Sequence, residues 1–203
     1  MNSAKTLRTA TGMDLTLLAL MVMMWAGAFS AIRVVAHHTG PIWLAADRVF
    51  IGFLFLAAAS VFLPALRVNL KMPWGRLFFI AILNVSIPFS LISWAELSIS
   101  ASMTSLLMGA GPFMALGIMH VFTQDERLNR LKIVAAVVGF SGVLIAIGPD
   151  AITGDGDISF LPVVAVLGAS LSYIISGLLV KRTAMNPMAM ATGTLLIGSV
   201  QLI

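Results

Sequence analysis

The sequence predicts an all-α polytopic membrane protein. Of its 203 residues, 60% are hydrophobic and only 10% are charged, whereas soluble domains average about 45–50% apolar and about 25% charged residues. Seven apolar stretches run along the chain, and Lys and Arg collect in every second connection between them. The composition excludes a soluble fold, and the net charge of +4 fits loops beside anionic lipid headgroups rather than a nucleic-acid-binding surface.

Each apolar stretch is expected to form a membrane-spanning helix. A helix needs about 20 predominantly apolar residues to cross about 30 Å of hydrocarbon, and the first six stretches approach that length, while the seventh meets the chain end. In order along the chain, the stretches are 15–36, 41–63, 77–95, 101–122, 131–147, 160–180 and 189–203.

The basic residues predict the orientation of these helices. Positively charged residues favour the cytoplasmic side of a membrane. On one side of the predicted membrane lie Lys5, Arg8, Arg67, Lys71, Arg76, Arg127, Arg130, Lys132, Lys181 and Arg182, and the opposite connections carry His37, His38, Glu96, Asp150, Asp155 and Asp157. We therefore expect a multi-pass protein of a bacterial inner (plasma) membrane with a cytoplasmic N-terminus over residues 1–13.

The chain also contains a weak internal repeat. A shift of 146 positions aligns seven identical residues, which are Leu15 with Leu161, Ala19 with Ala165, Ser30 with Ser176, Val34 with Val180, Pro41 with Pro187, Ala45 with Ala191 and Gly52 with Gly198. Five stretches separate the copies, so the second copy enters the membrane from the opposite face. Such inverted repeats are typical of secondary transporters with a substrate site between the halves.

The repeat divides the chain into a first unit of five helices over 14–148, an outer loop over 149–158 and the start of a second unit over 159–203. A complete second unit would add about ninety residues and three helices. We therefore expect an inverted-repeat bundle of ten helices in the full protein, of which this chain holds about seven.

Several short motifs resemble those of one transporter family. They are Trp25-Ala26-Gly27-Ala28-Phe29 with Arg33, then Pro41 and Ala45-Ala46-Asp47-Arg48, then Ala101 to Leu107, Gly111-Pro112-Phe113, Asp125-Glu126-Arg127-Leu128, and Gly139 with Gly142-Val143. In order and spacing they resemble the EamA domain of the drug/metabolite transporter (DMT) superfamily. The resemblance implies a ten-helix inner-membrane exporter of small metabolites, often amino acids or related compounds.

Two prolines predict breaks within the third and fourth helices. Pro88 has no N–H to donate to the carbonyl of Asn84, and Pro112 likewise leaves the carbonyl of Met108 free. Such breaks near the membrane centre offer polar backbone groups to a cavity. The alternative is that these helices carry Pro and Gly for packing only.

A substrate site is expected near the midplane between the two copies. Trp25 lies about eleven residues into its helix, and Tyr173 lies close to the corresponding place in the second copy. Together with Asn84, Ser90 and Met108 they are the residues that we expect to line the site. Plain core packing is the alternative for each of them. In the fifth helix, the small residues Ala135, Gly139, Gly142 and Ala146 are interpreted as a packing face.

Charged residues within the predicted helices are expensive and usually functional. Arg48 lies roughly 10 Å below the outer surface, by seven residues at 1.5 Å each, and should face the bundle interior. There it would orient a substrate carboxylate or take part in a structural network. The neighbouring Asp47 is the candidate for a coupling proton. Arg33 lies near the outer surface, where its side chain is expected to snorkel.

No motif in the sequence points to catalysis. The chain has no Cys, no phosphate-binding loop and no nucleophile with a base at recognisable spacing, so we expect neither an enzyme nor a metal or other cofactor. The expected partners are a small-molecule substrate, the lipid bilayer and, as one alternative, a second copy in a homodimer, but not nucleic acid. The alternative function is a non-transporting membrane scaffold or assembly subunit.

Overall fold

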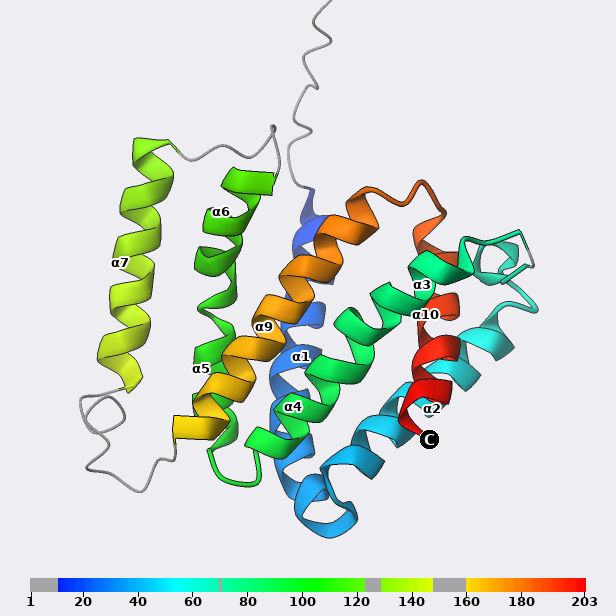
Figure 1. Cartoon of the computed structure of the whole chain (residues 1–203), viewed down its shortest axis with the longest axis horizontal. Helices are drawn as coiled ribbons and strands as arrows, with labels where there is room; N and C mark the ends of the chain where they lie inside the picture. The colour runs from blue at the N-terminus through cyan, green and yellow to red at the C-terminus, as the bar shows by residue number, and fades with distance from the viewer. Residues whose placement is uncertain (1–10, 70, 123–128, 148–159) are drawn as a thin grey trace, which may run out of the picture.

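A computed structural model describes residues 11–69, 71–122, 129–147 and 160–203 of the chain. The part described consists of helices with no strand. The predicted outer loop 149–158 lies outside it, as do residues 1–10 of the predicted cytoplasmic N-terminus and the predicted cytoplasmic segment with Arg127. Each of the seven predicted stretches corresponds to a helix or to a helix with a break (Figure 1). The prediction of an all-α polytopic membrane protein is confirmed.

The first two helices form a hairpin whose ends are fixed by local sequence. Helix α1, Gly12–Thr39, begins after Thr11, which forms a reciprocal capping box with Asp14. Gly40 then adopts a φ of 83°, which a residue with a Cβ rarely adopts. Helix α2, Pro41–Ala59, follows with Pro at its first position, where no N–H is needed. A short 3₁₀ turn, η1 at Pro64–Leu66, follows the second stretch.

The third and fourth stretches are each broken once. The third consists of α3, Trp74–Ala81, a π-helical turn η2, Ile82–Ser86, and α4, Ile87–Ala95. The fourth consists of α5, Ala101–Met108, and α6, Gly111–Phe122. The breaks lie directly before Pro88 and Pro112.

The remaining helices are α7, Arg130–Ile147, α9, Phe160–Lys181, and α10, Pro187–Leu202. Asn186 caps α10 by accepting a hydrogen bond from the backbone N–H of Met188 at 2.9 Å. In Figure 1, α1 and α9 run in opposite directions, and so do α2 and α10. An inverted repeat requires this arrangement, because these are the helices that the shift of 146 positions pairs.

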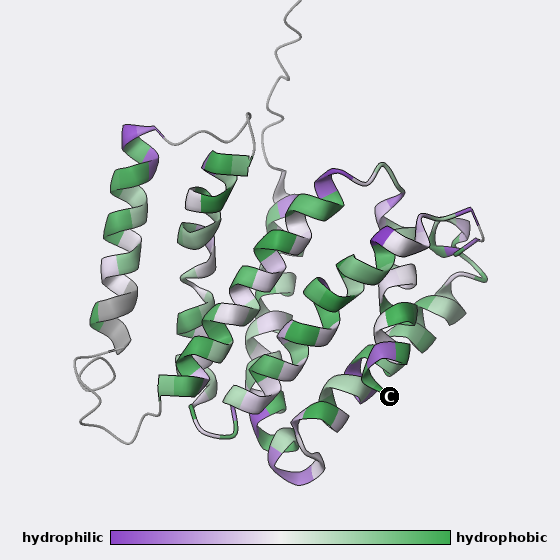
Figure 2. Ribbon diagram, viewed as in Figure 1, coloured by the Kyte–Doolittle hydropathy of each residue, from purple (hydrophilic) through white to green (hydrophobic). Residues whose placement is uncertain are grey.

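Within the described residues, five helical segments are long and apolar enough to cross a membrane, namely Gly12–Thr39, Pro41–Ala59, Trp74–Ala95, Ala101–Phe122 and Phe160–Lys181. Hydrophilic residues lie mainly at helix ends and in connections (Figure 2). The third stretch packs between α9 on one side and α2 with α10 on the other (Figure 1). In this central position the π-helical turn contacts both α9 and α10.

Candidate functional site

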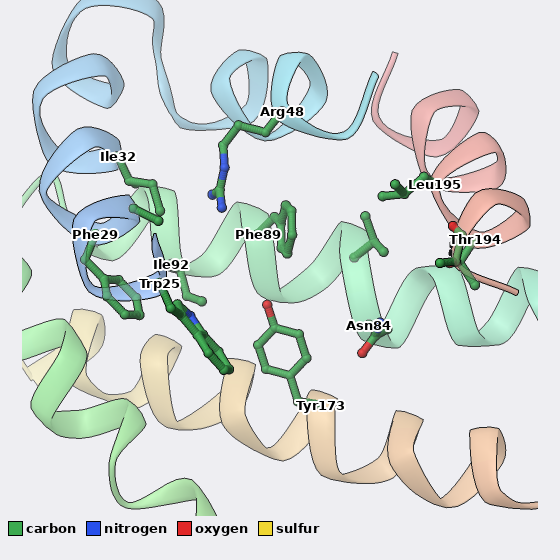
Figure 3. Close-up of a pocket in the computed structure, with 13 residues that line it drawn as sticks. Trp25, Phe29, Ile32, Arg48, Asn84, Phe89, Ile92, Tyr173, Thr194 and Leu195 are labelled. Carbon is green, nitrogen blue, oxygen red and sulfur yellow. Dashed lines mark hydrogen bonds between the residues drawn. The ribbon is translucent and has the colours of Figure 1, made fainter. Parts of the chain in front are cut away.

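A cavity of about 400 Å³ lies beside the π-helical turn, among α1, α2, α4, α9 and α10 (Figure 3). Its lining is mostly apolar and aromatic with a few polar groups, as in most small-molecule sites. The lining residues are Trp25, Ala28, Phe29, Ile32, Arg48, Asn84, Val85, Phe89, Ile92, Tyr173, Ala191, Thr194 and Leu195.

Four of the residues expected at a substrate site lie together in this cavity. They are Trp25 of α1, Arg48 of α2, Asn84 of the π-helical turn and Tyr173 of α9. Each comes from a different helical segment, so the site exists only because the bundle brings these segments together. Figure 3 shows the hydroxyl of Tyr173 pointing into the space beneath Arg48 and Phe89.

Arg48 supplies the positive charge of the cavity. Its side chain is half-buried, and its guanidinium carbon lies 4.5 Å from the centre of the Phe89 ring, which is a cation–π contact. Among the described residues, Arg48 forms no hydrogen bond and no ion pair of 4 Å or less. A guanidinium carries five N–H donors, and here these donors remain available to a ligand in the cavity.

The π-helical turn that carries Asn84 forms hydrogen bonds with side chains of α9 and α10. In a π-helical register, residue 88 would donate to the carbonyl of Leu83, but Pro88 has no N–H. The hydroxyl of Ser172 donates to this carbonyl instead, at 2.7 Å. The hydroxyl of Ser86 donates to the side-chain oxygen of Gln201 at 2.6 Å. Ser172 of α9 therefore supplies the donor that the break lacks, and the bond from Ser86 ties the turn to α10.

Met108 lines a second pocket of about 370 Å³, next to the break between α5 and α6. Its sulfur accepts a hydrogen bond from the hydroxyl of Ser170 at 3.2 Å. Pro112 also lines this pocket, and Trp25 and Tyr173 line both the pocket and the cavity. The two aromatic side chains therefore form the boundary between the two spaces.

Two of the expected site residues lie elsewhere. Ser90 is half-buried on α4 and lines neither space, and the side chain of Asp47 is exposed on α2. Successive residues of an α-helix point about 100° apart, so the orientation that brings Arg48 into the cavity turns Asp47 away from it.

Comparison with known proteins identifies the family. The model of the EamA-like transporter family matches residues 13–148, which is more than half of the chain. The chain belongs to the EamA-like transporter family.

Two curated relatives match most of the chain, including part of it beyond residue 148. An "Uncharacterized transporter" of Archaeoglobus fulgidus is 26% identical over 188 residues, covering 91% of this chain and 64% of the relative. The "Uncharacterized transporter YvbV" of Bacillus subtilis is 26% identical over 190 residues, covering 92% of this chain and 60% of the relative. The chain thus spans less than two thirds of the length of either relative. No solved structure matches it.

Several cavity residues of this EamA-like chain were not predicted from the sequence. One of them, Thr194, could have been predicted from the internal repeat. Thr194 lies 146 positions after Arg48, so the two occupy equivalent places in the two copies, and both line the cavity. Phe89 follows Pro88 directly. A phenylalanine in an apolar helix can face either lipid or the bundle interior, so the sequence alone does not place it in the cavity.

Arg33 and Glu96 also differ from expectation. Arg33 does not simply snorkel, because its guanidinium donates to the backbone carbonyls of Glu96, at 3.1 Å, and Ile99. It thereby neutralises unpaired carbonyls at the C-terminal end of α4. Glu96 is fully buried. Within the described ranges, no group of three or more His, Cys, Asp or Glu side chains could hold a metal ion.

Proposed function

We propose that this chain forms the substrate-binding part of a secondary transporter, which exports small metabolites such as amino acids or related compounds across the bacterial inner membrane. The proposal rests on membership of the EamA-like family and on one observation about the cavity. Arg48 is unpaired there among the described residues, beside aromatic side chains and the Asn84 amide.

The cavity chemistry favours a substrate with a carboxylate and an apolar or aromatic body. Arg48 is the only charged residue among the described lining residues, and an unpaired guanidinium in a partly buried site is costly unless an anion binds it. A carboxylate can accept two parallel hydrogen bonds from a guanidinium. Trp25, Phe89 and Tyr173 provide aromatic surface for the remainder of the molecule.

The broken helices support transport by alternating access. The two breaks adjoin the cavity and the second pocket, respectively, and discontinuous helices at the repeat interface are typical of secondary transporters. We propose that the two copies rock about this site, with the N-terminus in the cytoplasm. A non-transporting scaffold would need neither an unpaired arginine nor a cavity.

Flux in vesicles tests the proposal. The full-length protein is reconstituted, and efflux of a panel of radiolabelled L-amino acids is compared between the wild type and Arg48→Ala. A charge-assisted hydrogen bond contributes about 1.5–3 kcal/mol, so we expect KM to rise about 10- to 150-fold. Arg48→Lys keeps the positive charge but loses the planar guanidinium, so its KM should lie between those of the wild type and Arg48→Ala.

The control is the yield of folded, detergent-solubilised protein, which should be similar for all three forms. No flux above empty vesicles for any member of the panel, with folded wild-type protein, would contradict transport of this substrate class. Flux that is equal in the wild type and Arg48→Ala would contradict the assignment of Arg48.

A further inference from the structure

Glu96 carries a carboxyl group that is buried where α4 ends. It follows the last residue of α4 and has no exposed surface. Neither oxygen of its side chain has a hydrogen-bond partner among the described residues. An ionised carboxylate in such a place is strongly unfavourable, because it loses water and gains no donor in return.

Polar and charged groups surround Glu96 from several helices. Arg33 of α1 donates to the backbone carbonyl of Glu96 and not to its carboxylate. Thr104 of α5 is fully buried, and its hydroxyl donates to the carbonyl of Ser100 at 3.2 Å. Arg48 of α2 acts on the carboxylate through its charge, and Tyr173 of α9 in turn faces Arg48.

These neighbours affect the balance between the protonated and the ionised form of the Glu96 side chain. Glu96 lies beyond the apolar span Trp74–Ala95. Burial raises the pKa of Glu96 from 4.5 to about 7, although the nearby hydroxyl of Thr104 and the positive charges of Arg33 and Arg48 oppose this shift. The protonated form suits the structure as it stands. The ionised form would need a partner, and the unpaired guanidinium of Arg48 is available.

We propose that Glu96 is a proton-binding site that controls substrate binding at Arg48. This inference rests on the proposed transport function. While Glu96 holds a proton, Arg48 is free to bind the carboxylate of the substrate. When Glu96 gives this proton to water, its carboxylate pairs with Arg48 and the substrate anion leaves. One proton and one substrate are then bound together and released together, and Glu96 replaces the exposed Asp47 as the coupling residue.

Proton binding is measured directly on the full-length protein in lipid nanodiscs, without any substrate. Infrared difference spectra recorded during a pH titration report the loss of a protonated carboxyl group. We expect the wild type to lose such a group near pH 7, Glu96→Gln to lack this transition, and Asp47→Asn to retain it. A transition that persists unchanged in Glu96→Gln, or no transition in folded wild type, would overturn the proposal.

The pH dependence of stability gives a second readout. A carboxyl group whose pKa is higher in the folded than in the unfolded state makes the folded state bind more protons between the two values, so stability falls as pH rises from about 4.5 to about 7. This fall should disappear in Glu96→Gln. If that variant is not recovered folded, Glu96→Asp must shift the infrared midpoint, and an unmoved midpoint would refute the assignment.

The vesicle assay separates this proposal from transport itself. Flux of the amino-acid panel that responds to pH in the wild type but not in Glu96→Gln supports coupling through Glu96. Flux with an identical pH response in both forms overturns the coupling while leaving transport intact. An infrared transition at Glu96 together with no flux in the wild type would instead refute the transport function, and with it the coupling.

Discussion

Removing the hydroxyl of Ser172 should loosen the π-helical turn that forms one wall of the cavity. This hydroxyl donates to the Leu83 carbonyl at 2.7 Å, and Ser172 is only 5% exposed. Pro88 cannot replace the lost donor, so Ser172→Ala leaves a buried acceptor unsatisfied. Such an acceptor costs about 1–3 kcal/mol, but hydrogen bonds between membrane helices average about 0.6 kcal/mol and reach about 1.7 kcal/mol. We therefore expect a loss of about 1–2 kcal/mol.

Ser176 provides a matched control one turn along the same helix. It is fully buried, and its hydroxyl has no hydrogen-bond partner among the described residues. Ser176→Ala removes a buried polar group that gains nothing from the protein, so its free energy of unfolding should stay unchanged or rise slightly. Both free energies are measured by SDS titration of the purified full-length protein. An equal loss in the two variants would refute the role given to Ser172.

Two further predictions concern packing and orientation. Ring atoms of Phe113 fill the space that a Cβ at Gly139 would need, whereas nothing lies within 4 Å of a Cβ at Gly142. Gly139→Ala should therefore lower the free energy of unfolding by about 1–3 kcal/mol in the same titration. Gly142→Ala should not lower it. Similar values for both would contradict this packing of α6 on α7. In this cysteine-free chain, a cysteine at Asn69 should label only from the cytoplasm and one at His38 only from outside; the reverse pattern would overturn the orientation.

The helices could be predicted from the sequence because hydropathy, prolines and caps act locally. Pro41 and Pro187 begin α2 and α10, and Pro88 follows the π-helical turn. Arg48 was predicted to face inward from its depth alone. Ser90 follows Asn84 by six residues, which is about 240° around an α-helix at 100° per residue, so the two side chains would lie on different faces even without the π-helical turn.

Other features could not be predicted, because they depend on which helices pack together. The bond from Ser172 to Leu83 joins residues 89 positions apart. The burial of Glu96 depends on the helices packed around α4, namely α1, α2 and α9. The sequence indicates that a carboxylate follows this helix, but only the packing shows that the carboxylate is buried.

The central claim is that Arg48 holds the carboxylate of a substrate in the cavity. Its most direct test is competition in the vesicle assay between L-phenylalanine and L-phenylalaninamide, which differ in the carboxylate. The account predicts that the acid inhibits efflux of the labelled amino acid about 10- to 150-fold more strongly than the amide in the wild type, and that Arg48→Ala largely removes this preference. Equal inhibition by acid and amide in the wild type would contradict it.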